Sequence, residues 1–257
     1  MKRSFKRFAI VGVALMSLVE TGFSQSADRI NVVTTAVPFL RISPDARAGG
    51  MGDVGVATSP DANSQFYNLA KYPFNKNPGG LSLTYTPWLK DLGLNDVYLA
   101  SLAGYYKIDE QQSISASLRY FSLGNIQFTD ALGNDLNSFR PREVGVDVGY
   151  SRKLSDHLSL GVALRYINSN LAGGAAVNGV SYKAGSAVAG DIGLFYTTAN
   201  ESGQGWNFGA AMTNLGSKIS YTSDATQKDY IPANLGLGVG HTWVINEVNK
   251  FTLNLDI

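Results

Sequence analysis

The stretch Glu143-Val-Gly-Val-Asp-Val-Gly-Tyr-Ser151 alternates strictly between apolar residues and small or charged ones. Three valines and Tyr150 occupy the even positions, while Glu143, Asp147, Ser151 and two glycines occupy the odd ones. Successive side chains of a β-strand point to opposite faces. The stretch therefore predicts a strand with one apolar face and one polar face.

The same alternation recurs from Leu81 to the end of the chain. It predicts nine strands, at about residues 81–87, 96–107, 112–122, 142–153, 157–168, 185–197, 205–213, 233–244 and 250–257. Short polar connections alternate with long segments rich in Gly, Asn and Ser, the long ones being 123–141, 169–184 and 214–232. Outer-membrane barrels combine short periplasmic turns with long external loops. We therefore expect an all-β fold, a transmembrane antiparallel β-barrel.

Two further patterns agree with a barrel. Aromatic residues lie at the ends of the apolar faces, namely Tyr106, Tyr120, Tyr150, Tyr166, Tyr196, Trp206 and Trp243. Membrane barrels carry such aromatic girdles at both interfaces, whereas the core of a soluble sandwich favours aromatics at strand centres. The polar faces carry Arg119, Arg165, Glu143, Asp147, Asp191 and Asp256. Because buried charges must be paired or hydrated, we expect cross-barrel salt bridges that pack the lumen rather than a transport path.

The first 24 residues have the organisation of a secretory signal peptide. Lys2, Arg3, Lys6 and Arg7 form a basic start, an apolar run follows from Phe8 to Val19, and small residues precede a cleavage site before Gln25. The apolar run is too short to span a bilayer. The chain then divides into a signal peptide (1–24), a segment without alternation (25–80) and the barrel strands (81–257).

The segment 25–80 predicts a plug of short helices. Ser-Pro-Asp-Ala occurs twice, at 43–46 and 59–62, and serine followed by proline is a helix-start pattern in which the hydroxyl caps the helix and the aspartate favours its positive end. We expect the plug to fill the periplasmic half of the barrel, with its glycines allowing close approach to the wall. The plug residues that we single out are Pro44, Asp45, Arg47, Gly50, Gly52 and Asp53.

Several classes of function are excluded by composition. The chain has no cysteine and only His157 and His241, so we predict no metal, no cofactor and no enzyme activity. Gly50 to Gly55 fits G-x-G-x-x-G but lacks the strand and helix that a dinucleotide site requires. A net charge of +1 gives no case for a nucleic-acid partner.

Three stretches resemble one family. They are Thr35–Ala57, Asp61-Ala-Asn-Ser-Gln-Phe-Tyr-Asn-Leu-Ala-Lys71 and Leu83-Thr-Tyr-Thr-Pro-Trp-Leu89. Together they resemble the PorV (LptO) family, outer-membrane components of the type IX secretion system of Bacteroidetes, which is similar to the FadL transporters. Leu69 stands where many FadL-like relatives have proline, which weakens a transport function of the FadL type.

The resemblance implies an outer-membrane barrel of 14 strands with an N-terminal plug. Nine strands lie in this chain, so we expect further C-terminal strands. It also implies an adaptor that binds the C-terminal signal domain of secreted cargo, docks beside the translocon channel SprA (Sov) and delivers cargo to the attachment complex containing PorU. The alternative is a FadL-like transporter of hydrophobic small molecules.

Long loops on a rigid scaffold commonly carry binding residues, and aromatic and arginine side chains dominate interfaces. We therefore expect the external loops to bind the partner. The residues predicted for this contact are Phe128, Phe139, Arg140, Arg142, Tyr182, Tyr221 and Tyr230.

Overall fold

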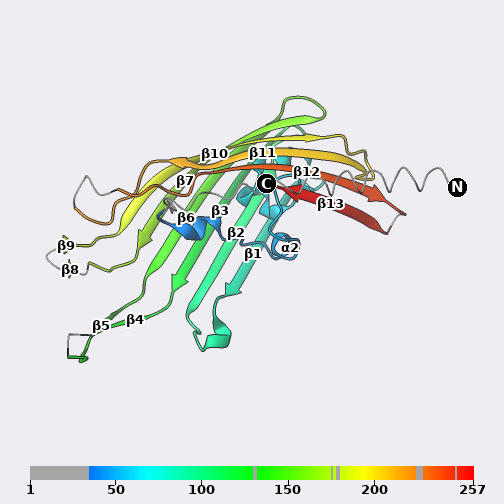
Figure 1. The fold of residues 1–257 in the computed structure, drawn as a ribbon. Coiled ribbons are helices and arrows are strands. Elements are labelled where there is room, and N and C mark those ends of the chain that lie inside the picture. The colour runs from blue at the N-terminus through cyan, green and yellow to red at the C-terminus, as the bar shows by residue number, and fades with distance from the viewer. Residues whose placement is uncertain (1–34, 130–131, 175, 178–179, 224–227, 247) are drawn as a thin grey trace, which may run out of the picture. The chain divides into compact units, whose positions relative to one another are not determined.

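Nine long strands form one antiparallel sheet in the computed structural model (Figure 1). The structure describes residues 35–129, 132–174, 176–177, 180–223, 228–246 and 248–257, so the predicted signal peptide lies outside the described residues. The strands, in their order across the sheet, are β1 (Gly79–Pro87), β2 (Val97–Lys107), β3 (Gln112–Leu123), β6 (Arg142–Lys153), β7 (Leu158–Asn170), β10 (Gly185–Thr197), β11 (Gly205–Gly216), β12 (Asn234–Val244) and β13 (Lys250–Asp256). All nine predicted strands are confirmed, with ends that differ by at most three residues.

The connections alternate in length as predicted. Residues 108–111, 154–157, 198–204 and 245–249 connect strands at one end, which we call the short-turn end. The long connections lie at the opposite, long-loop end, and two of them contain small hairpins where the sequence predicts only loops. These are β4 (Ile126–Thr129) with β5 (Asp135–Phe139), and β8 (Ala176–Val177) with β9 (Val180–Ser181). Their strands are too short to show a clear periodicity of two. Figure 1 shows the β4–β5 hairpin projecting beyond the main sheet.

The two faces of the sheet have opposite chemistry. In β6, Glu143, Asp147 and Ser151 are buried, whereas Val146 and Val148 are exposed. This arrangement inverts that of a soluble protein, in which burying a Val or Leu side chain contributes about 1.5–3 kcal/mol. A continuous apolar outer face is stable only against an apolar solvent, which is what a lipid bilayer provides.

Aromatic side chains form two rows on the outer face. At the short-turn end, ring contacts connect Tyr196, Phe208, Trp206, His241, Trp243 and Phe251 across four strands. At the long-loop end, the Tyr98 ring lies 5.1 Å from that of Tyr85 and 6.0 Å from that of Tyr120. The rows lie at both ends of the apolar band, as the two girdles of a membrane barrel do.

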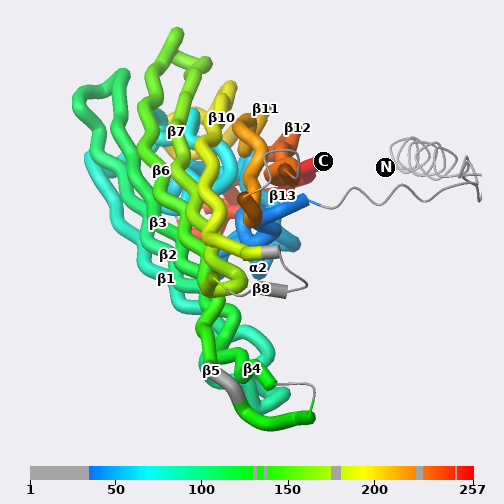
Figure 2. The backbone as a smooth tube through the Cα atoms, turned by 90° about the vertical axis from the view of Figure 1, so that its left-hand side faces the viewer, coloured from blue at the N-terminus to red at the C-terminus, as the bar shows by residue number. Residues whose placement is uncertain are grey.

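Residues 35–78, which we call the inner segment, lie against the polar face (Figure 2). They contain η1 (Pro38–Arg41), α2 (Ala46–Gly49), η2 (Ala62–Phe66) and η3 (Leu69–Phe74), and a further short helix, η4 (Lys90–Leu92), lies between β1 and β2. Within the described part of the chain, no helix has the length and apolar character needed to cross a membrane.

The two Ser-Pro-Asp-Ala repeats do begin short helices, but the prediction that serine caps them is wrong. Asp45 is the N-cap of α2, and its carboxylate accepts hydrogen bonds from the backbone N–H groups of Arg47 and Ala48. Asp61 caps η2 in the same way. The helices begin at Ala46 and Ala62, so the aspartate directly before each start, and not the serine two positions earlier, occupies the N-cap position.

The inner segment extends along the full length of the strands, from the long-loop end to the short-turn end, rather than along the periplasmic half only. At the long-loop end, the Ala36 N–H donates to the Tyr230 carbonyl at 2.9 Å. Between the two ends, Asn68 Nδ2 donates to the carbonyl of Leu194 in β10 at 2.8 Å. At the short-turn end, Lys76 Nζ contacts the Glu201 carbonyl at 2.5 Å. The prediction of a half-filled lumen is therefore corrected.

A charge on the outer face should destabilise the protein in a bilayer. We expect Val146→Arg to lower the free energy of unfolding by about 2–4 kcal/mol, because the guanidinium would replace an exposed apolar side chain at membrane depth. The neighbouring change Gly145→Ala is the control, since its Cβ would meet no atom closer than 3.6 Å. Urea unfolding of the full-length protein in lipid vesicles measures both, and equal losses would contradict the assignment of the faces.

Candidate functional site

A cluster of ion pairs lies at the centre of the polar face. Arg165 of β7 pairs with Asp147 of β6, and its Nη2 lies 2.8 Å from Asp191 Oδ2 of β10. Asp147 also accepts a hydrogen bond of 2.6 Å from Ser117 Oγ, and Arg165 contacts Asn214. All are buried, and Asp147 and Arg165 face each other directly across two paired strands. The predicted salt bridges are confirmed, but they join neighbouring strands rather than opposite walls.

Other inner charges hold the inner segment by its backbone. Arg119 Nη1 donates to the Leu40 carbonyl at 2.9 Å, and its guanidinium lies 5.2 Å from the Phe66 ring centroid. Asp256 Oδ2 accepts from the N–H groups of Gly55 and Val56 at 2.6 and 2.8 Å. Each of these charges therefore satisfies a backbone group that helices and strands leave unpaired.

Glycines of the wall allow the close approach of the inner segment at several points. A Cβ on Gly161 of β7 would lie 2.8 Å from the Ala70 nitrogen, and one on Gly149 of β6 would lie 2.7 Å from Leu69 Cδ1. In contrast, Gly50 and Gly52 are exposed, and Gly52 has φ of 79° with open space around it. Gly50 and Gly52 thus form an exposed turn, whereas Gly55 of the same segment does approach the wall, where its N–H donates to Asp256 Oδ2 at 2.6 Å.

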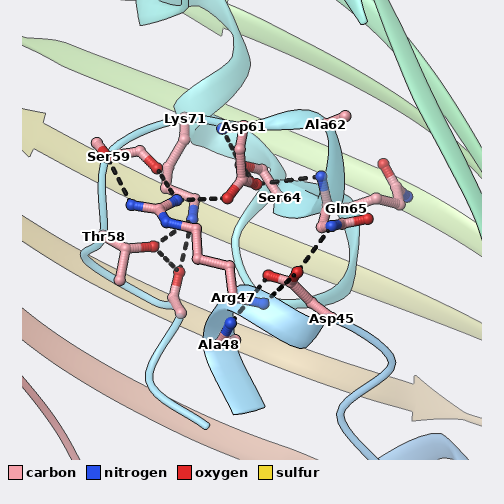
Figure 3. Close-up of polar contacts among 12 residues, drawn as sticks. Asp45, Arg47, Ala48, Thr58, Ser59, Asp61, Ala62, Ser64, Gln65 and Lys71 are labelled. Carbon is pink, nitrogen blue, oxygen red and sulfur yellow. Dashed lines mark hydrogen bonds and ion pairs between the residues drawn. The ribbon is translucent and has the colours of Figure 1, made fainter. Parts of the chain in front are cut away.

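The two repeats brace each other (Figure 3). Arg47 pairs with Asp61, and its Nη2 donates to Ser59 Oγ at 2.7 Å. Asp45 accepts a hydrogen bond of 2.9 Å from Asn63 Nδ2. Of the predicted plug residues, Asp45 and Arg47 are thus brought together. Pro44, which directly precedes Asp45, is also buried. Asp53 lies in the exposed turn with φ of 63°.

Lys71 is a functional candidate that the sequence reasoning missed. Its side chain is fully buried, and Nζ donates to the Gly55 carbonyl at 2.6 Å and to Thr58 Oγ1 at 3.0 Å. Burial lowers the pKa of Lys71 to about 8, and the charge of Asp61 opposes this shift. The signal was present, since Lys71 ends the second stretch that carries the family resemblance.

The predicted loop residues fall into two groups. Tyr230 is 63 % exposed, with Lys218 Nζ lying 4.0 Å from its ring centroid, and Arg140 and Arg142 are also exposed. Phe128, Phe139 and Tyr182 are half-buried. Tyr221 is half-buried as well, packs beside Ile219 and donates to Ser169 Oγ at 2.9 Å. Its position is that of a packing residue.

No metal-binding group emerges from the part of the chain that the structure describes, where no three His, Asp or Glu side chains gather suitably. On the inner face, Asp147 and Asp191 pair with Arg165, Arg119 and Asp256 bind the backbone of the inner segment, and Glu143 accepts a hydrogen bond of 2.7 Å from Ser169 Oγ.

An apolar outer face with aromatic rows, a filled polar inner face, and short turns opposite long loops define the class of outer-membrane β-barrel proteins. The sequence model of the type IX secretion system protein PorV matches residues 24–257, and the chain belongs to this family. Among solved structures, the chain is similar to the toluene transporter TodX of Pseudomonas putida, with 13% identity and a TM-score of 0.44, over 76% of this chain and 65% of that one. Comparison with curated proteins gives no match.

Removing the central cation should be costly. We expect Arg165→Met to lower the free energy of unfolding by about 3–5 kcal/mol, because Asp147 and Asp191 would remain buried without a counter-charge. The triple variant that also carries Asp147→Asn and Asp191→Asn should lose less, since no uncompensated charge remains. Urea unfolding of the full-length protein in lipid vesicles compares the two. A triple variant with a lower free energy of unfolding than the single variant would contradict this account.

Lys71 should make stability depend on pH. Unfolding returns its pKa from about 8 to 10.5, so between these values the unfolded chain binds a proton that the folded protein does not. The stability of the wild type relative to Lys71→Met should therefore rise with pH across this window, by about 3 kcal/mol at most. Lys76→Met is the control, because Lys76 is exposed. The test follows the heat-induced loss of the band of folded full-length protein on SDS gels at pH 7, 8, 9 and 10. The same pH dependence of stability in the wild type and in Lys71→Met would refute the prediction.

Proposed function

We propose that this protein is an adaptor of the type IX secretion system. It binds the C-terminal signal domain of secreted cargo at its long-loop end, beside the translocon channel SprA (Sov), and passes the cargo to the attachment complex containing PorU. The protein is not an enzyme in this proposal. The signal peptide of residues 1–24 is removed, and residues 25–80 act as the plug.

The observation that carries the proposal is that the inner segment lies along the polar face from one end of the strands to the other. Ion pairs around Arg165 lie at the centre of the polar face. The inner segment contacts the strands from Ala36 at the long-loop end to Lys76 at the short-turn end. A filled interior supports a role in which partners bind at the ends of the strands. Membership of a secretion-system family supports a protein as that partner.

The long-loop end has the composition of a binding surface. Tyr230, Arg140 and Arg142 are exposed there, and aromatic and arginine residues dominate the binding energy of protein interfaces. The loop that carries Tyr230 is also anchored, because Ile219 and Ile231 of the same loop are buried beneath it. An anchored loop presents its side chains with little loss of conformational entropy on binding.

Single changes at this surface should weaken cargo capture. We expect Tyr230→Ala and Arg140→Ala each to cost about 1–2 kcal/mol of binding, since each removes an exposed contact without disturbing the buried anchor. Co-purification of the cargo signal domain with tagged full-length protein measures capture, and cell-surface labelling of cargo measures delivery. Leu154→Ala, at an exposed position of the short-turn end, is the control.

Normal capture and delivery of cargo in the Tyr230 and Arg140 variants would contradict the proposal that cargo binds at the long-loop end. Loss of uptake of hydrophobic molecules on deleting the gene, with cargo delivery intact, would favour the FadL-like transporter instead.

A cavity of about 370 Å³ lies between the inner segment and β11 to β13, but Arg119, Asp53 and Asp256 line it, and charged walls do not suit a hydrophobic ligand.

A further inference from the structure

We propose that a groove on the apolar outer face binds one phospholipid from the leaflet at the short-turn end. Arg152 binds the phosphate of this lipid, and one acyl chain lies in the groove. The site goes beyond the proposed function, because it concerns the membrane around the strands and not the cargo at the long loops.

The groove lies where β2, β3 and β6 are neighbours, and its volume is about 460 Å³. Gly104 of β2 and Ala116 of β3 face each other across the paired strands and leave the space that larger side chains fill elsewhere. Tyr106, Ile114 and Val148, all exposed on the outer face, line the groove beside them. The groove therefore has apolar sides and a width set by two small residues.

The groove is a depression in the surface and not an opening through the wall. Every residue of β3 from Ser113 to Ser122 has a backbone partner in both β2 and β6. Because the bilayer core holds no water, lipid chains fill a depression at this depth. Lipid tails are as apolar as the side chains, so close packing, and not exclusion of water, holds a chain there.

The charge for the headgroup comes from Arg152. Among the outward positions of the nine strands, within the part of the chain that the structure describes, Asp, Glu, Lys and Arg occur only as Arg142 and Arg152, both on β6. Their separation of ten residues corresponds to about 33 Å along a strand. A strand tilt of about 40° reduces this to about 25 Å, the height of the apolar band of a membrane barrel. Arg152 therefore lies at the depth of the lipid phosphates.

The guanidinium of Arg152 is available to a phosphate. Arg152 is exposed, and no ion pair formed among the described residues includes it. The carboxylate of Asp109 in the adjacent turn already accepts hydrogen bonds of 2.7 Å from the Gln111 N–H and from Gln112 Nε2. A guanidinium offers a phosphate two parallel hydrogen bonds, which makes arginine well suited to this contact.

The groove and Arg152 follow one line along β6. Val148 pairs with Ala116, and Arg152, which pairs with Gln112, lies about 13 Å further along the strand. Tyr150, an aromatic residue of the girdle, lies between them, and its hydroxyl donates to Gln112 Oε1. A phospholipid covers this distance, because its acyl chains run from the glycerol beside the phosphate toward the centre of the bilayer.

The experiment measures lipid binding to purified full-length protein by native mass spectrometry, with phosphatidylglycerol as the probe. We expect Arg152→Gln to lower the affinity for one lipid molecule about five- to tenfold. Ala116→Phe should lower it as well, because the ring occupies the groove. The controls are Arg142→Gln, with the same loss of charge at the other end of β6, and Ala210→Phe, with the same exchange at an outward position of β11. Both should bind the lipid as the wild type does.

Equal affinity in the wild type and all four variants overturns the proposal. Loss of affinity in Arg152→Gln without loss in Ala116→Phe also overturns it, because attraction between charges then explains the binding without the groove. If Ala116→Phe keeps the lipid but loses a membrane protein that co-purifies with the wild type, the groove is a protein interface and the proposal fails. None of these outcomes bears on cargo capture by the long loops.

A second measurement leaves the groove intact and decides the question where Ala116→Phe does not fold. The chain has no cysteine, so Leu118→Cys beside the groove and Ile192→Cys on β10 each provide one site for a fluorophore. In vesicles with a small fraction of brominated phosphatidylglycerol, quenching should be stronger at position 118 than at position 192. Adding Arg152→Gln should remove the difference. Equal quenching at the two positions would contradict the site.

Discussion

The structure depends on one constraint, which is that the inner face of the sheet carries full charges that must find partners away from bulk water. An unpaired buried charge costs about 3–5 kcal/mol, which is a large fraction of the stability of a protein domain. Arg165 meets this constraint by pairing with Asp147 and Asp191. Asp147 also accepts a hydrogen bond from Ser117 Oγ, and Asp191 accepts one from the Asn214 N–H. Because β6, β7 and β10 are neighbours, these pairs also fix the register of the central strands.

The inner segment follows from the same constraint. Its backbone groups, which short helices leave unpaired, are the partners of Arg119, Lys71 and Asp256. The segment reaches these side chains because the wall carries glycines such as Gly161 at the points of contact. An interior organised in this way is held by contacts from one end of the strands to the other, from Ala36 to Lys76. The chain belongs to the family of the type IX secretion system protein PorV.

The sequence predicted the strands well because a periodicity of two is a local property. Nine alternating stretches, their inward and outward faces and the alternation of turn lengths all required only neighbouring residues. The helix starts were found for the same reason, but the choice between Ser43 and Asp45 as the cap was not, because it depends on which side chain reaches the free N–H groups. The hairpins of the long loops were missed because strands of two to five residues show too little pattern.

The amino-acid sequence by itself determined the class of this protein: an all-β chain with one apolar face, aromatic rows at both ends of it and charges on the other face. Tertiary structure alone decided which charges pair, that Lys71 is buried, that Tyr221 packs inward while Tyr230 stays exposed, and that the chain runs from the long loops to the short turns. The physical reason is separation along the chain. Asp256 binds the N–H of Gly55 across 201 residues, and no local pattern encodes a contact that exists only once the strands have assembled.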